Sequence, residues 1–287
     1  MNQRENILKV IRHEKPETTP VLPEAAFMCG NWAANESGQR GEEVRPGVVL
    51  DCFGCEWDVS HGDPTPLPGS EMLADIEDWR DVVKFPDVES WDWDALAKVE
   101  LEGYNADEQI MLFFDENGIF DRISFLMGFE ECLVSMLEDP EEFKALAEAI
   151  ADYKIKVIEL VAKHFKPDMF MYTDDLAKVD GLFMSPKVYR ELIKPAQARI
   201  IAAIHDNGMI AMQHTCGKPE AIIGDYVEIG VDVWFPAQAC NDIPALCEKY
   251  GDKIVFCGGF DSQGLAGRPD ATEEVIRAEA RRCVDEY

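Results

Sequence analysis

Short, uninterrupted apolar runs alternate with longer amphipathic segments along most of the chain. Apolar runs of this kind, without a polar residue at every second position, are typical of strands buried on both faces, as in parallel sheets. The longer segments carry apolar residues at the three- and four-residue spacing of a helix. We expect strands at residues 110–114, 169–172, 209–212, 231–235 and 254–257.

Helix-start signals mark several segments between the runs. Asp139 and Pro140 give an acidic cap followed by proline in the first turn, and both are favoured at helix N-termini. Ser185 and Pro186 start a second helix in the same way, and Pro195 should kink it because proline lacks the main-chain N–H. Further helices are expected at residues 4–13, 125–137, 242–250 and 272–287.

The N-terminal part of the chain is less regular. Residues 21–24 are expected to form a strand that ends in the carboxylate of Glu24. Residues 31–68 are rich in glycine, proline and polar residues and show no sustained periodicity, so we expect a long excursion from the main fold there. Cys52 and Cys55 form an isolated C-x-x-C pair, which we interpret as a turn with two ordinary thiols.

Strands that alternate with helices predict parallel β-α-β units, and therefore an α/β fold. A TIM (β/α)8-type barrel fits better than a doubly wound sheet, because no G-x-G-x-x-G follows a strand and polar residues follow nearly every strand. The chain ends in or just after a helix, so a last strand is missing from the predicted barrel. We expect a single domain over residues 1–287. If the chain is a piece of a longer one, the barrel should be unclosed and expose a strand edge.

Composition limits the partners of the chain. The formal net charge is −29, which argues against nucleic acid and anionic membrane surfaces as partners, because both need a basic face. The apolar stretches are too short to span a membrane, and the N-terminus is charged rather than apolar. Nine cysteines without a secretion signal indicate a reducing compartment. We therefore expect a cytoplasmic protein.

His214 and Cys216 are the strongest candidates for chemistry. They follow the apolar run at residues 209–212 and stand two residues apart, so in an extended chain their side chains point to the same side. An imidazole and a thiol together suit zinc. The alternative is a buried histidine and a buried cysteine that merely pack, and the spacing alone leaves both interpretations open.

Other polar residues also follow predicted strands. Asp174 and Asp175 are adjacent and should point to opposite sides. One would then face the pocket as a hydrogen-bond acceptor or general base, and the other would cap a neighbouring loop. Tyr172 is a third candidate catalytic residue, with core packing as the alternative. The candidate substrate-binding residues are Glu24, Asp115 and Gln238.

Several motifs occur in an order and at a spacing that are known from one group of enzymes. These are Asp174-Asp175-Leu176, Met184-Ser185-Pro186 with Tyr189 and Pro195, His214-Thr215-Cys216-Gly217, and Tyr250-Gly251-Asp252-Lys253 before Gly258-Gly259-Phe260-Asp261. In these motifs the chain resembles the uroporphyrinogen decarboxylase superfamily, whose branches include decarboxylases of haem synthesis and corrinoid-dependent methyltransferases. The resemblance covers roughly residues 105–285 and implies a TIM barrel.

Charge decides which branch the chain resembles better. The decarboxylases carry an arginine-rich segment that grips substrate carboxylates, whereas residues 24–32 contain neither Arg nor Lys here. The acidic strand ends would also repel an octacarboxylate porphyrinogen, and no histidine follows His214. The resemblance therefore implies a methyltransferase. A porphyrinogen decarboxylase and a barrel without catalytic activity are the alternatives.

The resemblance also implies a metal and a partner protein. In zinc-dependent members of this branch, a His-x-Cys pair and a later Cys hold zinc, which keeps the thiol of the methyl acceptor as a thiolate. His214 and Cys216 match the pair, and Cys257 is the best third ligand, with Glu24 or Cys240 behind it. The methyl group would come from methylcobalamin on a corrinoid protein, because this chain has no corrinoid-binding module. Without zinc, tetrahydrofolate is the implied acceptor.

Overall fold

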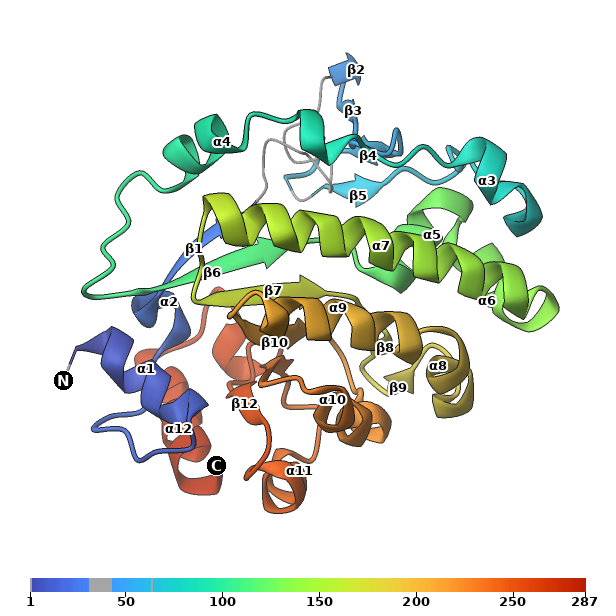
Figure 1. Ribbon diagram of the computed structural model, residues 1–287. Helices are drawn as coiled ribbons and strands as arrows, with labels where there is room; N and C mark the ends of the chain where they lie inside the picture. The colour runs from blue at the N-terminus through green and yellow to red at the C-terminus, as the bar shows by residue number, and fades with distance from the viewer. Residues whose placement is uncertain (1, 31–42, 63) are drawn as a thin grey trace.

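A parallel sheet of six strands forms the centre of the molecule, whose computed structural model describes residues 2–30, 43–62 and 64–287 (Figure 1). In spatial order the strands are β1 (Ala26–Gly30), β6 (Ile110–Asp115), β7 (Met169–Thr173), β10 (Ile210–His214), β11 (Val233–Ala237) and β12 (Val255–Gly258). The strands of this sheet follow one another in the same order along the chain and across the sheet, and they are joined by crossovers that contain helices, as in a TIM-type barrel. The predicted α/β class is therefore confirmed.

The two edge strands of this sheet are β1 and β12. Within the described ranges they do not pair with each other, so the sheet is open between them. Parallel strands have their carboxyl ends at one common edge of the sheet, which is where ligands bind in such folds. Residues that follow Asp115, Thr173, His214 and Ala237 therefore lie along one edge.

Helices follow each of the main strands from β6 onward, and α7 and α9 run along one face of the sheet (Figure 1). The α-helices are α1 (Gln3–Ile11), α2 (Leu22–Ala25), α3 (Trp79–Val82), α4 (Trp93–Glu100), α5 (Ile119–Met127), α6 (Phe129–Glu138), α7 (Pro140–His164), α8 (Pro186–Leu192), α9 (Lys194–Asp206), α10 (Ile223–Ile229), α11 (Ile243–Tyr250) and α12 (Glu273–Glu286). Short 3-10 turns lie at Ile76–Asp78, Val88–Ser90, Glu220–Ile222 and Leu265–Gly267. No helix in the described part of the chain is long and apolar enough to cross a membrane.

Residues along each strand alternate between two cores. In β7, Phe170 and Tyr172 face the large core formed with the helices, whereas Met169 and Met171 belong to a smaller core with Ile7 of α1. We call the side of the smaller core the inner face. Because side chains alternate along a strand, the residues that continue this inner series at the strand ends are Thr173, His214, Phe235 and Cys257.

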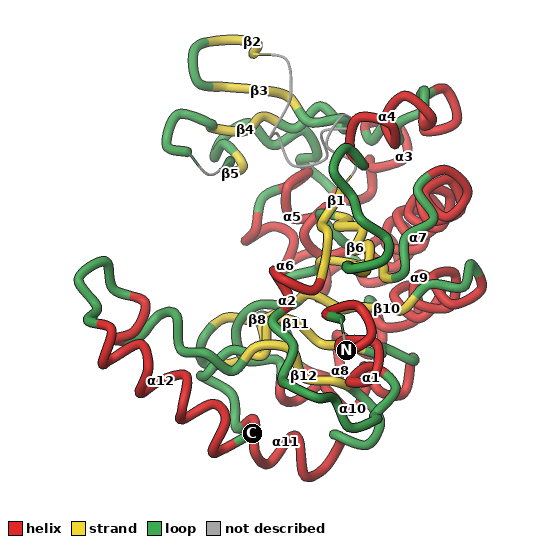
Figure 2. The backbone as a smooth tube through the Cα atoms, turned by 90° about the vertical axis from the view of Figure 1, so that its left-hand side faces the viewer, coloured by secondary structure: helices red, strands yellow, loops and turns green. Residues whose placement is uncertain are grey.

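A second, antiparallel sheet lies in the segment where a long excursion from the main fold was expected, residues 31–68. It consists of β2 (Glu43–Arg45), β3 (Val48–Leu50), β4 (Glu56–Asp58) and β5 (Thr65–Pro66), and residues 31–42 of the predicted excursion lie outside the described residues. Figure 2 shows this small sheet on the α5 side of the molecule. Strands this short have too few residues to show a period of two in the sequence. A two-stranded ribbon, β8 (Ala177–Lys178) and β9 (Gly181–Leu182), follows β7.

Most predicted boundaries are confirmed, with two corrections. The predicted strand at residues 21–24 is wrong: this segment forms α2, with Pro23 in its first turn, and β1 starts after it. The predicted helix at residues 125–137 is two helices, because Gly128 between α5 and α6 has a φ of +89°. The break expected from Pro195 is present, between α8 and α9.

Candidate metal centre

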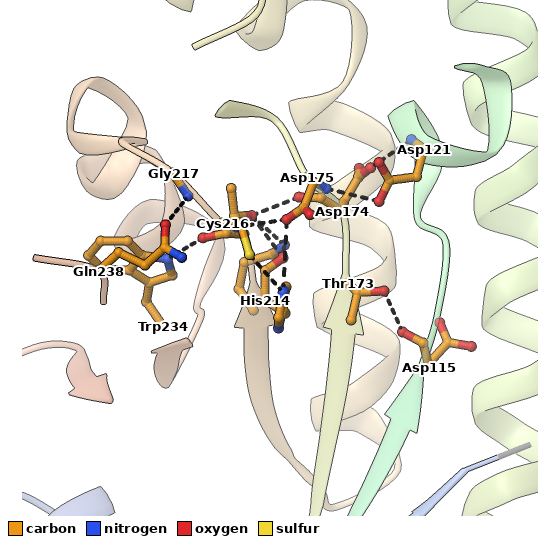
Figure 3. Close-up of polar contacts among 12 residues, drawn as sticks. Asp115, Asp121, Thr173, Asp174, Asp175, His214, Cys216, Gly217, Trp234 and Gln238 are labelled. Atoms are coloured by element: carbon orange, nitrogen blue, oxygen red, sulfur yellow. Dashed lines mark hydrogen bonds and ion pairs between the residues drawn. The ribbon is translucent and has the colours of Figure 1, made fainter. Parts of the chain in front are cut away.

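His214 and Cys216 lie side by side at the carboxyl edge of the sheet (Figure 3). His214 is the last residue of β10, and its Nε2 is 3.4 Å from the Cys216 Sγ. Asp175, two residues beyond β7, completes the group: its Oδ1 is 3.9 Å from His214 Nε2 and accepts a hydrogen bond of 2.7 Å from the Cys216 N–H. One ligand atom from each of the three residues lies within 4.8 Å of the others. We call Asp175, His214 and Cys216 the metal triad.

The environment of the triad favours the metal-binding form of His214, the neutral imidazole, and opposes the metal-binding form of Cys216, the thiolate. Burial lowers the pKa of His214, against the opposing effect of the Asp175 charge, so the imidazole is neutral and its Nε2 can coordinate. Burial, followed by the charge of Asp175, raises the pKa of Cys216 to about 12. The thiol therefore keeps its proton until a cation binds beside it and favours the thiolate.

The contacts of the two ring nitrogens of His214 distinguish a metal site from a catalytic Cys-His-Asp relay. Nδ1 is buried and has no hydrogen-bond partner among the described residues. In a catalytic Cys-His-Asp arrangement, the carboxylate holds the ring nitrogen that points away from the nucleophile. Here Asp175 and Cys216 both approach Nε2. The three side chains thus converge on one point, as ligands do, rather than forming a relay.

The turn that carries Cys216 is held from several sides. Gly217 has a φ of +78°, and a Cβ atom there would lie 2.7 Å from the main-chain oxygens of Ala177 and Lys178, so only glycine fits. The Gly217 N–H donates to Gln238 Oε1 at 2.7 Å, and the Gly217 carbonyl accepts from Asn241 Nδ2 at 2.8 Å. Gln238, a predicted substrate-binding residue, is therefore close to the triad and positions its turn.

Asp174 and Asp175 point in opposite directions, as the adjacent positions predict. Asp174 is fully buried and accepts hydrogen bonds from the N–H groups of Ile119 and Asp121, at 3.1 Å each, and from the Tyr172 hydroxyl at 3.1 Å. It therefore binds the N-terminus of α5, whose positive dipole end favours a carboxylate. Burial raises the pKa of Asp174 to about 6, against these hydrogen bonds.

Tyr172 belongs to the same support rather than to the triad. It is fully buried in the large core, and its hydroxyl accepts a 2.8 Å hydrogen bond from the Ile119 N–H besides donating to Asp174. Gly118 permits this close packing, because a Cβ atom there would lie 2.5 Å from the Tyr172 hydroxyl and from the Thr173 carbonyl. The structure thus places Tyr172 and Asp174 behind Asp175.

Asp121 is a site residue that the sequence analysis missed. Its Oδ2 accepts a 2.9 Å hydrogen bond from the Asp175 N–H, and Figure 3 shows Asp175 between Asp121 and Cys216. Burial and the charges of Asp174 and Asp175 raise the pKa of Asp121 well above its usual value. We call Asp121, Asp174 and Asp175 the carboxylate cluster. The signal available in the sequence was an acid in the first turn of the helix after β6.

Asp115 and Glu24 are not brought to the triad. Asp115 continues the helix-facing series of β6, is buried, and forms an ion pair with Lys154 of α7, 3.1 Å apart. Figure 3 shows its side chain on the far side of Thr173 from Cys216. Glu24 is exposed on α2 and precedes β1, so it lies at the amino edge of the sheet, opposite to the triad. Glu24 was expected near the site because residues 21–24 were predicted to form a strand, but this segment forms α2.

Cys257, the predicted third ligand, lies in a different environment. It is two strands from His214, because β11 lies between β10 and β12 in the sheet, and neighbouring strands are about 4.8 Å apart. Its side chain lines an apolar cavity of about 260 Å³ between α1 and the inner face, and burial raises its pKa to about 11. Asp175 thus occupies the position beside His214 and Cys216 that the sequence analysis gave to Cys257.

Comparisons with known proteins address the fold and the family. A solved structure described as a methyltransferase from Methanosarcina mazei aligns with 100% of this chain and 90% of its own, with a TM-score of 0.69 and 15% identity. At that identity the likeness establishes a shared fold. None of the curated proteins compared with the chain matches it.

The sequence profile of the uroporphyrinogen decarboxylase (URO-D) family matches residues 48–287. This match covers both sheets from β3 onward and every residue of the metal triad and the carboxylate cluster. It confirms the family to which the sequence motifs pointed. The chain belongs to the uroporphyrinogen decarboxylase (URO-D) family.

Proposed function

We propose that this protein is a methyltransferase that transfers a methyl group from a corrinoid partner protein to a thiol. The observation that carries the proposal is the convergence of a carboxylate, an imidazole and a thiol in the metal triad. The structural likeness to a methyltransferase supports it. The acidic surroundings of the triad disfavour the alternative of porphyrinogen decarboxylation, because the substrate of that reaction is polyanionic.

The donor set of the triad fits zinc. Oxygen, nitrogen and sulfur ligands are the set that zinc accepts, and three protein ligands with a fourth open position are typical of catalytic zinc sites. A zinc ion held there would lower the pKa of an acceptor thiol and supply a thiolate nucleophile at neutral pH. Asp175, rather than Cys257, is the proposed third ligand.

The residues of the chain then have separate tasks. His214, Cys216 and Asp175 would hold the zinc ion, and Asp175 Oδ1 also accepts a hydrogen bond from the Cys216 N–H. Asp174, Tyr172 and the N-terminus of α5 fix the main chain next to Asp175. A site supported in this way keeps its ligands in place before the substrate arrives.

The proposed reaction is a displacement at the methyl carbon. The acceptor thiol loses its proton to solvent, and its sulfur forms a bond to the methyl carbon of the corrinoid carried by the partner. The cobalt–carbon bond breaks, and its electron pair stays on cobalt, so the corrinoid leaves in the cobalt(I) state. The products are a methyl thioether and the reduced corrinoid protein, and no further oxidant or reductant is consumed.

Metal content tests the proposal. Protein purified without chelator should contain about one zinc per chain, in keeping with a single three-ligand site. Cys216→Ala should lose this zinc, because a site with two remaining ligands binds weakly. Cys257→Ala is the matched control, since it removes a thiol that is also partly buried but lies outside the triad, and it should keep the zinc.

Two results would count against this assignment. Zinc that survives in Cys216→Ala but is lost in Cys257→Ala would restore the ligand set expected from the sequence. If the unaltered protein contains no zinc even after incubation with zinc and gel filtration, activation of the acceptor thiol by zinc is ruled out. Methyl transfer to tetrahydrofolate would then be the reaction to assay.

A further inference from the structure

Thr215 stands between two residues of the metal triad, His214 and Cys216, and is fully buried. Its main-chain N–H donates to the Phe235 carbonyl of β11 at 2.9 Å. Its hydroxyl contacts the strand on the other side, because Oγ1 is 2.7 Å from the Asp174 carbonyl oxygen just beyond β7. Thr215 thus connects the turn after β10 to both neighbouring strands, although it contributes no ligand atom to the triad.

The hydrogen bonds around this hydroxyl indicate where its proton points. The His214 carbonyl, 2.8 Å from Oγ1, already accepts from the Asp174 N–H and from Gln213 Nε2. The Tyr226 hydroxyl, 2.9 Å away, and Gln213 Nε2, 3.1 Å away, can both donate to Oγ1. A hydroxyl donates one hydrogen bond and accepts two. The Thr215 hydroxyl therefore accepts from these two groups and donates to the Asp174 carbonyl.

This link takes the place of a main-chain hydrogen bond between two strands. β7 and β10 pair in parallel, and at their carboxyl ends the Asp174 N–H donates to the His214 carbonyl at 3.1 Å. The next bond of a regular parallel ladder would run from the Cys216 N–H to the Asp174 carbonyl. Here the Thr215 hydroxyl occupies that carbonyl, and the Cys216 N–H donates instead to Asp175 Oδ1 at 2.7 Å. The Asp175 carboxylate thereby lies beside the other two residues of the triad.

We propose that Thr215 is a positioning residue of the metal site. Its hydroxyl holds the Asp174 carbonyl and so keeps the Asp175 carboxylate beside His214 and Cys216 before a metal binds. This inference rests on the proposed function and names a residue that sets the geometry of the same site without binding the metal. Valine at this position has nearly the same shape but cannot donate. The Asp174 carbonyl would then pair with the Cys216 N–H and release Asp175.

Zinc affinity and the visible spectrum of the cobalt(II)-loaded protein test the inference without a methyl donor. Thr215→Val should raise the Kd for zinc about tenfold or more, whereas Thr215→Ser, which keeps the hydroxyl, should stay within about threefold of the unaltered protein. The sulfur-to-cobalt band should persist in Thr215→Val, because Cys216 still binds, while the d–d bands change as Asp175 leaves. A purely structural role of Thr215 would lower stability but leave this spectrum as it is.

A double-mutant cycle tests whether Thr215 acts through Asp175. In a chain that already carries Asp175→Ala, adding Thr215→Val should leave the Kd for zinc unchanged, because no third ligand remains to be positioned. If Thr215→Val weakens zinc binding equally with and without Asp175, the inference is overturned.

Tyr226→Phe is the matched control. It removes a hydrogen bond to the same buried hydroxyl but keeps the link from Thr215 to the Asp174 carbonyl, so it should leave the Kd for zinc unchanged. A weakening as large as that of Thr215→Val would assign the effect to the buried network in general, and would overturn the specific role of Thr215.

The outcomes separate the two proposals. If the unaltered protein binds neither zinc nor cobalt, the proposed function fails. If it binds both and Thr215→Val binds zinc equally tightly, the positioning role alone is overturned. If Thr215→Val does not fold, hydrogen exchange of the unaltered, metal-free protein replaces it. The Cys216 N–H should then be protected, and exchange as fast as in an exposed loop overturns the inference.

Discussion

Two neighbouring residues of α5, Asp121 and Arg122, belong to charged regions that are organised in opposite ways. Arg122 forms a buried ion pair with Asp51 and stacks over Phe53, with its guanidinium 4.1 Å from the ring centre. Asp51 also accepts hydrogen bonds from the N–H groups of Phe53 and Cys55. We call this region the Asp51 pair. Its charges cancel, and it fastens the small antiparallel sheet to α5.

The carboxylate cluster has the opposite balance. Asp174 is held by N–H groups and a hydroxyl, and Asp121 holds the Asp175 N–H. The charges of these carboxylates act on one another, and burial together with this repulsion raises the pKa of Asp121. A region whose charges cancel fixes architecture, whereas one that keeps an excess of negative charge next to a thiol and an imidazole is ready for a cation.

The largest effect is expected when the cation of the Asp51 pair is removed. Arg122→Met should lower the free energy of unfolding by about 3–5 kcal/mol, because Asp51 is left as a buried charge without its partner. Urea unfolding followed by circular dichroism measures the loss. Adding Asp51→Asn in the same chain should restore part of it, since the uncompensated charge is then gone. If the single variant loses less than about 1 kcal/mol of unfolding free energy, the buried pair contributes no more than an ordinary surface ion pair.

The second test titrates the carboxylate cluster. The pKa of Asp174 is 3.8 in an ordinary setting and about 6 in the folded protein, so between these values the folded chain holds a proton that the unfolded chain has lost. The contribution of Asp174 to stability therefore falls as pH rises through this range. Relative to Asp174→Asn, the unaltered protein should gain up to about 3 kcal/mol as pH falls from about 6 to about 4, at about 1.4 kcal/mol per pH unit.

Urea unfolding of both proteins across this pH range measures the difference between them. Asp174→Asn is a suitable reference because it keeps an acceptor for the N–H groups of α5 while removing the titration. A difference that is constant with pH, or that grows as pH rises, would mean that folding does not raise the pKa of Asp174.

The smallest effect is expected for an exposed ion pair in the same small sheet. Arg45 and Glu56 join β2 and β4 through two hydrogen bonds, but half of the Arg45 side chain is exposed. Arg45→Gln should leave the urea midpoint unchanged within the precision of the measurement, because solvent screens such pairs. A shift as large as that of Arg122→Met would show that the antiparallel sheet depends on all its ion pairs alike.

The sequence by itself determined the features that depend on neighbours along the chain. Apolar runs located β6, β7, β10 and β12 because a strand buried on both faces needs them. The two-residue spacing of His214 and Cys216 put their side chains together, and the adjacency of Asp174 and Asp175 put theirs apart, since side chains alternate in an extended chain. The family followed from motifs of the same local kind.

Only the tertiary structure decided which distant residues meet. Asp175 reaches the triad because β7 and β10 are neighbours in the sheet, and Cys257 does not because β11 lies between β10 and β12. Asp121 joins the cluster because Gly118 lets the N-terminus of α5 touch the end of β7. These contacts depend on strand order and on the close approach of a helix to a strand, and neither leaves a periodic trace in the sequence.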